Sequence, residues 1–297
     1  MPSSKAILYL EALFAVVVWG ANFVATKDVV SEISPVTIVW MRFGMGFLIL
    51  GATVAWRKQF ALPVKSDLAY LALLGFIGIT FHQWLQATGL ITAAATTTAW
   101  IVATIPIFTA ILAWLVLRER LGKIAVLGIA LATFGVLLIV SKGDLSALRS
   151  GNFGSIGDFL ILISAVNWAV FSVLSRRGLA SQPAARLMFY VMFFGWLFVS
   201  VWLFAFGPGL SEIPQLSSRG WGNILVLGIF GSGLAYIAWF DALREIPASR
   251  LSAFIYIEPL VTVIVAAIWI NEIITATSLI GGGIIIFGVV LVNRRQA

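Results

Sequence analysis

Long apolar segments and short polar stretches alternate along the whole chain. Ten of these segments hold about 20 predominantly apolar residues, the length that an α-helix needs to cross the roughly 30 Å hydrocarbon core of a bilayer. The pattern predicts membrane-spanning helices at residues 6–26, 35–56, 67–90, 94–117, 123–141, 155–176, 184–207, 220–243, 249–270 and 276–293. The expected fold class is an all-α polytopic membrane protein.

The first segment is expected to remain in the mature protein. It follows Lys5, but it holds Glu11 and Asn22 and lacks a small-residue cleavage site, so it differs from a signal peptide. One later stretch, 142–154, is rich in serine, glycine and charged residues and is typical of a linker. It divides the chain into a five-helix unit at 1–141 and another at 155–297.

The fourth predicted helix recurs as the ninth. A shift of 153 residues aligns Pro106 with Pro259 and Glu119 with Glu272 without a gap, and the match extends over about three helices. Because each unit has an odd number of helices, the two copies are expected to cross the membrane in opposite orientations. Inverted repeats of this kind are an architecture of secondary transporters, which bind their solutes at the interface between the repeats.

The composition excludes a water-soluble globular domain. The chain is 61% hydrophobic and only 10% charged, whereas soluble domains are about a quarter charged. Cysteine is absent and His82 is the only histidine, so disulfides, thiolate metal sites and histidine-rich metal clusters are excluded. We expect no metal and no cofactor. A P-loop is missing, so direct use of ATP is not expected.

The net charge of +7 reflects membrane orientation rather than nucleic-acid binding, because the basic residues lie at helix ends and not in one stripe. With both termini in the cytoplasm, fourteen lysines and arginines face inward and four face outward. This distribution follows the positive-inside rule. The loops also exchange charge between the copies: Arg118 and Lys123 correspond to Asn271 and Ala276. The expected partners are the lipid bilayer and a small-molecule substrate, without nucleic acid.

Several motifs carry a resemblance to a known family. The first helix holds WGANFVATK, a proline lies within both the fourth and the ninth helix, and LRER precedes a glycine-spaced fifth helix. In these features the chain resembles the drug/metabolite transporter superfamily, EamA type, and within it the YddG-like amino-acid exporters. The resemblance implies a bacterial inner-membrane location and a central cavity. The chain departs from the family pattern in two ways. The second copy lacks the basic pair after its proline helix. The membrane segments also hold no basic residue except Arg42, whereas the sugar-nucleotide and triose-phosphate carriers of the superfamily would be expected to hold several for binding phosphate.

Candidate cavity residues lie on several helices. His82 and Gln86 share one face of the third helix with three glycines, which suits either a binding site or interhelical hydrogen bonds. The resemblance places aromatic residues around the cavity, although tryptophan and tyrosine also populate membrane interfaces. An aromatic pocket accommodates apolar side chains and tolerates cations. The aromatic candidates are Trp19, Trp100, Trp168, Trp239 and Tyr256.

Pro106 and Pro259 are the candidate gating residues. Each leaves the carbonyl one turn earlier, that of Val102 or Ile255, without its helical hydrogen bond and bends the helix there. The alternative is a kink that only improves packing.

Three ionisable residues lie inside predicted helices: Glu11, Arg42 and Glu258. A charge within the bilayer costs about 3 kcal/mol on insertion scales, so each is a candidate for substrate binding or ion coupling. The alternatives are an ion pair between Glu258 and Arg42, and an interfacial position for Glu11.

These features predict a secondary exporter of small neutral or zwitterionic metabolites, among them aromatic or hydrophobic amino acids, working by alternating access. The alternative is an exporter of cationic drugs or quaternary ammonium compounds. An intramembrane enzyme is a remote alternative, because the helices hold no close acidic pair and no nucleophile with its base. The glycines of the fifth and tenth helices suit packing within a monomer or between the subunits of a homodimer.

Overall fold

The computed structural model describes residues 5–117, 122–144, 146, 154–246 and 252–293. Within these ranges every regular element is a helix and none is a strand, which confirms the predicted all-α class. Arg118, Glu119 and Arg120 of the basic motif lie outside the described residues, as do 145 and 147–153 of the predicted linker.

The first half of the chain forms eight helical elements. They are α1 (Lys5–Val29), α2 (Pro35–Trp56), α3 (Lys65–Gly75), the π-helical η1 (Phe76–Phe81), α4 (His82–Thr92), α5 (Ala95–Val102), α6 (Ile105–Leu117) and α7 (Lys123–Val140).

The second half has a similar order of elements. They are α9 (Ile156–Ser181), α10 (Ala184–Ala205), the short η2 (Ile213–Gln215), α11 (Ser218–Leu225), the π-helical η3 (Val226–Leu234), α12 (Ala235–Glu245), the 3₁₀-helical η4 (Ser252–Tyr256), α14 (Ile257–Trp269) and α15 (Ala276–Asn293).

The helices are long and apolar enough for a polytopic membrane fold. Among the described residues, eight continuous helical spans meet the requirement for crossing a bilayer, and Phe254–Trp269 and Ala276–Val292 are shorter apolar helices. All ten predicted segments are therefore helical, with ends close to those predicted.

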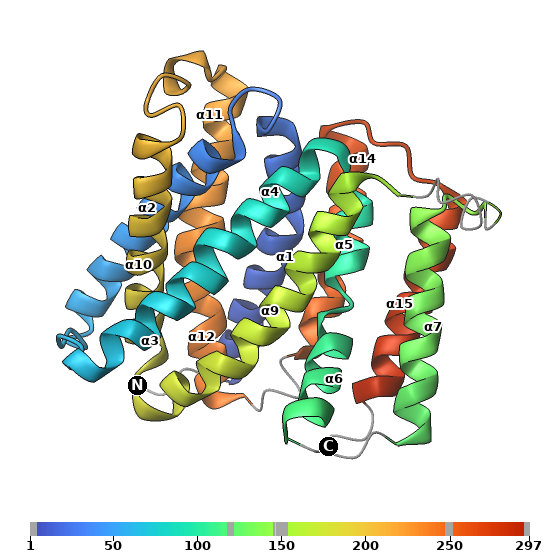
Figure 1. Ribbon diagram of the computed structural model, residues 1–297, viewed down its shortest axis with the longest axis horizontal. Coiled ribbons are helices and arrows are strands. Elements are labelled where there is room, and N and C mark those ends of the chain that lie inside the picture. The colour runs from blue at the N-terminus through green and yellow to red at the C-terminus, as the bar shows by residue number, and fades with distance from the viewer. Residues whose placement is uncertain (1–4, 118–121, 145, 147–153, 247–251, 294–297) are drawn as a thin grey trace.

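Helix α1 lies at the centre of the molecule (Figure 1), where it packs against α12 and α14. Helices α7 and α15 form a pair at one side, and both chain ends lie at the same end of the helices. Gly128 faces Gly288 in this pair, and a Cβ atom on Gly135 would lie 2.7 Å from the carbonyl oxygen of Gly281. The glycines of these two helices therefore serve close packing within the chain.

The two halves are interrupted at matching places. The π-helical segments η1 and η3 lie within the third and eighth predicted helices. In the fourth, α5 ends at Val102 and α6 begins at Ile105, directly before Pro106. In the ninth, η4 precedes α14, whose third residue is Pro259. The helices are thus interrupted beside Pro106 and Pro259, where the sequence predicted breaks, while the π-helical turns are interruptions that it did not predict.

Candidate binding cavity

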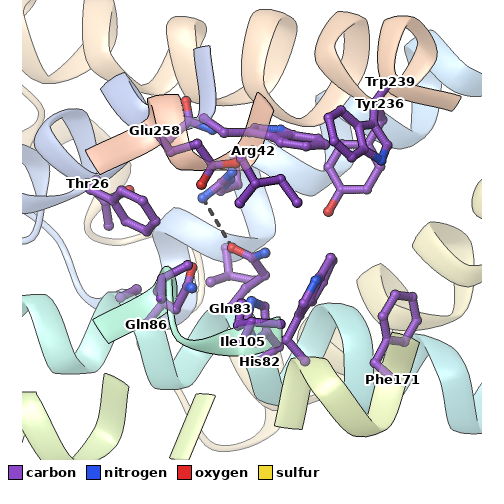
Figure 2. Close-up of a pocket in the computed structure, with 18 of the residues that line it drawn as sticks. Thr26, Arg42, His82, Gln83, Gln86, Ile105, Phe171, Tyr236, Trp239 and Glu258 are labelled. Carbon is purple, nitrogen blue, oxygen red and sulfur yellow. Dashed lines mark hydrogen bonds between the residues drawn. The ribbon is translucent and has the colours of Figure 1, made fainter. Parts of the chain in front are cut away.

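A cavity of about 180 Å³ lies between the two halves of the chain. Its walls come mainly from α1, α2, α4, α9 and α12, and smaller contributions come from the broken regions before and after the two prolines. Figure 2 shows Tyr236 and Trp239 on one side and His82, Gln86 and Phe171 on the other. The cavity therefore joins residues from distant parts of the sequence.

One wall is built from the rings of α1 and α12. Trp19 lies 5.3 Å from Trp239 and 5.6 Å from Tyr236, measured between ring centroids. The indole N–H of Trp19 donates a hydrogen bond of 3.1 Å to the carbonyl of Gly231 in η3. The π-helical segment thus provides an acceptor that fixes this aromatic wall.

The opposite wall contains His82, which directly follows η1. Its ring lies 4.6 Å from Trp168, and Trp168 lies 4.9 Å from Phe171. His82 Nδ1 is 3.2 Å from the carbonyl oxygen of Ser164. Because a carbonyl only accepts, Nδ1 is the donor in this contact.

Arg42 projects from α2 into the cavity and is only 7% exposed. Its Nε donates to Ser232 Oγ at 3.1 Å, and its Nη1 donates to Gln83 Oε1 at 3.3 Å (Figure 2). Its Cζ lies 4.9 Å from the centroid of the Phe43 ring. The guanidinium is thus held by neutral groups.

Glu258 lines the cavity from the first turn of α14 and is 6% exposed. Helix α1 approaches α14 closely there because Gly20 has no side chain. A Cβ atom at that position would lie only 2.7 Å from the carbonyl oxygen of Glu258. The ion pairs in the described part of the chain join Arg57 to Asp241 and Arg219 to Asp28. Glu258 and Arg42 therefore do not form an ion pair with each other, which was one of the alternatives for these residues in the sequence analysis.

The proline breaks border the cavity directly. Pro106 lines it, and so do Val102 and Ile255, whose carbonyls lie one turn before the two prolines. Pro259 is buried in α14 and is not among the lining residues. Both irregular stretches of backbone thus lie where protein and cavity, rather than lipid, surround them.

Two of the aromatic candidates lie elsewhere. Trp100 is 2% exposed and donates its indole N–H to Ser278 Oγ at 3.1 Å, while its ring covers Gly282 of α15. Tyr256 packs against the same apolar cluster. Neither residue is among those that line the cavity. For Trp100 the reason is the space over Gly282, which the indole ring fills.

Glu11 also lies outside the cavity. It is within electrostatic reach of Arg57 and Asp241, which form a bidentate ion pair with two N–O distances of 2.6 Å. Its Oε2 atom is buried and has no hydrogen-bond partner among the described residues. Since Arg57 follows the last residue of α2, this cluster lies at a helix end rather than at mid-membrane.

Sequence reasoning missed several polar groups of the cavity, among them Asn22, Thr26 and Gln83. The side-chain oxygen of Asn22 is buried without a partner among the residues described. The signal was present for α1, since Asn22 and Thr26 lie three and seven positions after Trp19 and share its helical face. No comparable signal distinguished Gln83 from Gln86.

At the end of the molecule opposite the termini, carboxylates cap helices of the other half. Glu212 accepts hydrogen bonds from the N–H and hydroxyl of Ser34 before α2, at 2.9 and 2.6 Å. Glu32 accepts from the N–H and hydroxyl of Ser217 before α11, at 2.7 and 2.8 Å. Glu272 caps α5 in the same way. Such caps accept hydrogen bonds from otherwise free N–H groups, and their negative charge interacts favourably with the positive end of the helix dipole.

Proteins of known sequence match the chain over nearly its whole length. An uncharacterized transporter of Archaeoglobus fulgidus is 29% identical, with 99% of both chains covered. The uncharacterized transporter YyaM of Bacillus subtilis is 32% identical over 95% of this chain and 92% of its own. A protein of Streptantibioticus cattleyicolor described as a probable terminal-alkyne amino-acid exporter is 26% identical, with 99% and 95% covered.

A crystal structure covers 99% of both chains with a TM-score of 0.69 at 19% identity, which shows a shared fold. The model of the EamA-like transporter family matches residues 5–141 and again residues 155–294. The chain therefore belongs to the EamA-like transporter family and is a multi-pass membrane transporter.

Proposed function

We propose that this transporter exports small zwitterionic or neutral metabolites, including aromatic or hydrophobic amino acids. The observation that carries the proposal is the composition of the cavity: aromatic walls surround a buried arginine and a buried glutamate that do not pair with each other. Rings accommodate an apolar side chain, and separate basic and acidic side chains suit a molecule that carries both a carboxylate and an amine. A relative described as a probable amino-acid exporter supports this class.

The size of the cavity supports a small solute. Sites for drug-sized ligands measure about 300–1,000 Å³, whereas this cavity measures about 180 Å³. A single buried arginine is also a poor match for a phosphorylated substrate, which favours several cationic partners.

We further propose that transport proceeds by alternating access between two inverted repeats in a bacterial inner membrane, with both termini cytoplasmic. The matching π-helical segments and proline breaks support this mechanism, because each half contains its own interruptions of the helices near the cavity.

Export of cationic drugs is the second candidate. Glu258 and the tryptophans favour a cation, but Arg42 lines the same cavity and repels one. Both candidates are tested in liposomes that contain the purified protein and are preloaded with a radiolabelled compound. Exchange of phenylalanine or leucine, without exchange of tetraphenylphosphonium, is expected. Exchange of tetraphenylphosphonium alone would support the drug exporter instead.

A further inference from the structure

Arg42 is a buried cation without a counter-ion among the described residues. Ion pairs in this part of the chain do not include it, and its hydrogen-bond partners, Ser232 and Gln83, are neutral. We infer that Arg42 is the receptor for the carboxylate of the transported solute. The inference rests on the proposed function and assigns one half of the solute's head group to one residue.

Burial of the Arg42 charge is costly. A guanidinium does not lose its proton in proteins, so Arg42 cannot avoid the cost of burial by becoming neutral. A buried charge is normally compensated by an opposite charge with good geometry. A carboxylate that enters the cavity supplies this compensation, and loss of solvent at the site strengthens the attraction.

The geometry leaves part of the guanidinium free to bind. Of its five N–H groups, those of Nε and Nη1 reach Ser232 and Gln83, and Nη2 has no hydrogen-bond partner in the part of the chain that the structure describes. Ser232 belongs to η3 and Gln83 to α4, so both halves of the chain hold the planar group in place. An arginine held in this way can offer the N–H groups of Nη2 to a carboxylate in a charge-assisted hydrogen bond.

Neighbouring groups define the rest of the head-group site. Tyr236 and His82 line the same cavity and lie close enough to Arg42 to interact with its charge. Glu258 lines the same cavity and does not form an ion pair with Arg42. A solute with a carboxylate at Arg42 and an ammonium group toward Glu258 matches both, which describes an α-amino acid better than an amine.

The test compares three ligands that share a phenyl ring: phenylalanine, 2-phenylethylamine, which lacks the carboxylate, and 3-phenylpropanoate, which lacks the amine. Binding to purified protein is measured for wild type, Arg42→Gln and Arg42→Lys. Wild type is expected to prefer phenylalanine to 2-phenylethylamine by about 30-fold or more, the effect of losing one partner of a buried charged pair. Arg42→Gln is expected to remove this preference, and Arg42→Lys to retain part of it.

The preference is a ratio within one preparation, so it does not depend on the folded fraction of a variant. Arg219→Gln is the matched control, because it also removes an arginine charge but lies outside the cavity, where Arg219 pairs with Asp28; its preference is expected to remain. A wild-type preference that persists in Arg42→Gln would overturn the inference, and so would equal binding of phenylalanine and 2-phenylethylamine by wild type. Arg42-dependent binding of 3-phenylpropanoate without amino-acid exchange would support the carboxylate site and refute the proposed substrate.

Discussion

The carboxylate of Glu272 accepts hydrogen bonds from both the backbone N–H and the hydroxyl of Thr96, and a further one of 3.0 Å from the N–H of Ala95. Glu272 follows α14 in the second half, whereas Thr96 lies in the first turn of α5 in the first half. This contact joins the halves at the end opposite the termini, next to the helix that breaks at the cavity.

We expect Glu272→Gln to open this end of the molecule. Loss of a helix cap costs about 1 kcal/mol, which corresponds to a roughly fivefold change in a two-state equilibrium. The chain has no cysteine, so Thr26→Cys provides a single label site on the cavity wall. An impermeant thiol reagent applied from the side opposite the termini is expected to label this cysteine about five times faster in Glu272→Gln.

Asp67→Asn is the control, because it removes a carboxylate from the first turn of α3 and leaves the α5 cap intact. Its labelling rate is expected to match that of the parent. Equal rates for Glu272→Gln and the parent would show that the cap does not hold this end closed.

Two tryptophans are expected to respond differently to replacement by alanine. Trp168→Ala removes the ring that contacts His82 in the cavity, so apparent affinity for the solute is expected to fall about tenfold while the protein stays folded. Trp100→Ala empties a fully buried site against Gly282, so it is expected to cost about 3–5 kcal/mol of stability. Thermal unfolding in detergent, paired with binding assays, separates the two effects. A loss of affinity in Trp100→Ala without a loss of stability would contradict this assignment.

Replacing both Pro106 and Pro259 with alanine is expected to slow transport by about tenfold and to change apparent affinity less. Alanine restores the N–H that bonds the carbonyl one turn earlier, so the breaks at the cavity tend to become continuous helix. Exchange rates in liposomes measure the effect. Pro35→Ala is the control, because a proline at the first position of a helix removes no internal hydrogen bond. Wild-type exchange in the double variant would identify the kinks as packing features.

Glu212 is expected to make stability depend on acid pH. Burial opposes ionisation, but the hydrogen bonds from Ser34 and Thr37 outweigh it and hold the pKa of Glu212 below its ordinary value of 4.5. A lowered pKa stabilises the folded state above the unfolded pKa, and this contribution is lost as the pH falls through the folded pKa. Wild type should therefore unfold at a higher temperature than Glu212→Gln at pH 7, and the difference should vanish in strong acid. A difference that is the same at both pH values would contradict the prediction.

Cysteines placed at positions 118 and 271 are expected to react from opposite sides of the membrane. Arg118 and Asn271 are equivalent in the sequence repeat, and the distribution of lysine and arginine predicts opposite faces of the membrane for them. Impermeant reagents added to intact cells or to inverted vesicles measure the side. Equal labelling of both positions from the outside would contradict the inverted repeat.

The sequence by itself determined the helical elements of this protein. Each membrane span needs about 20 apolar residues, so the hydrophobic pattern alone locates the helices. It also located the breaks at Pro106 and Pro259, because proline cannot donate the helical hydrogen bond. The spacing of Trp19, Asn22 and Thr26 also indicated which face of α1 lines the cavity. Residues three, four or seven positions apart share a helix face, and this relation can be read from the sequence of one helix alone.

Only the tertiary structure decided which side chains meet. Trp100 and Trp168 are both tryptophans within apolar helices, and the sequence treats them alike. Trp100 packs on Gly282, a residue 182 positions away in the chain, whereas Trp168 faces the cavity. Arg42 and Glu258 were candidates for one ion pair, yet each reaches the cavity separately. Such contacts depend on how helices rotate and pack against partners far away in the sequence, and no local pattern contains that information.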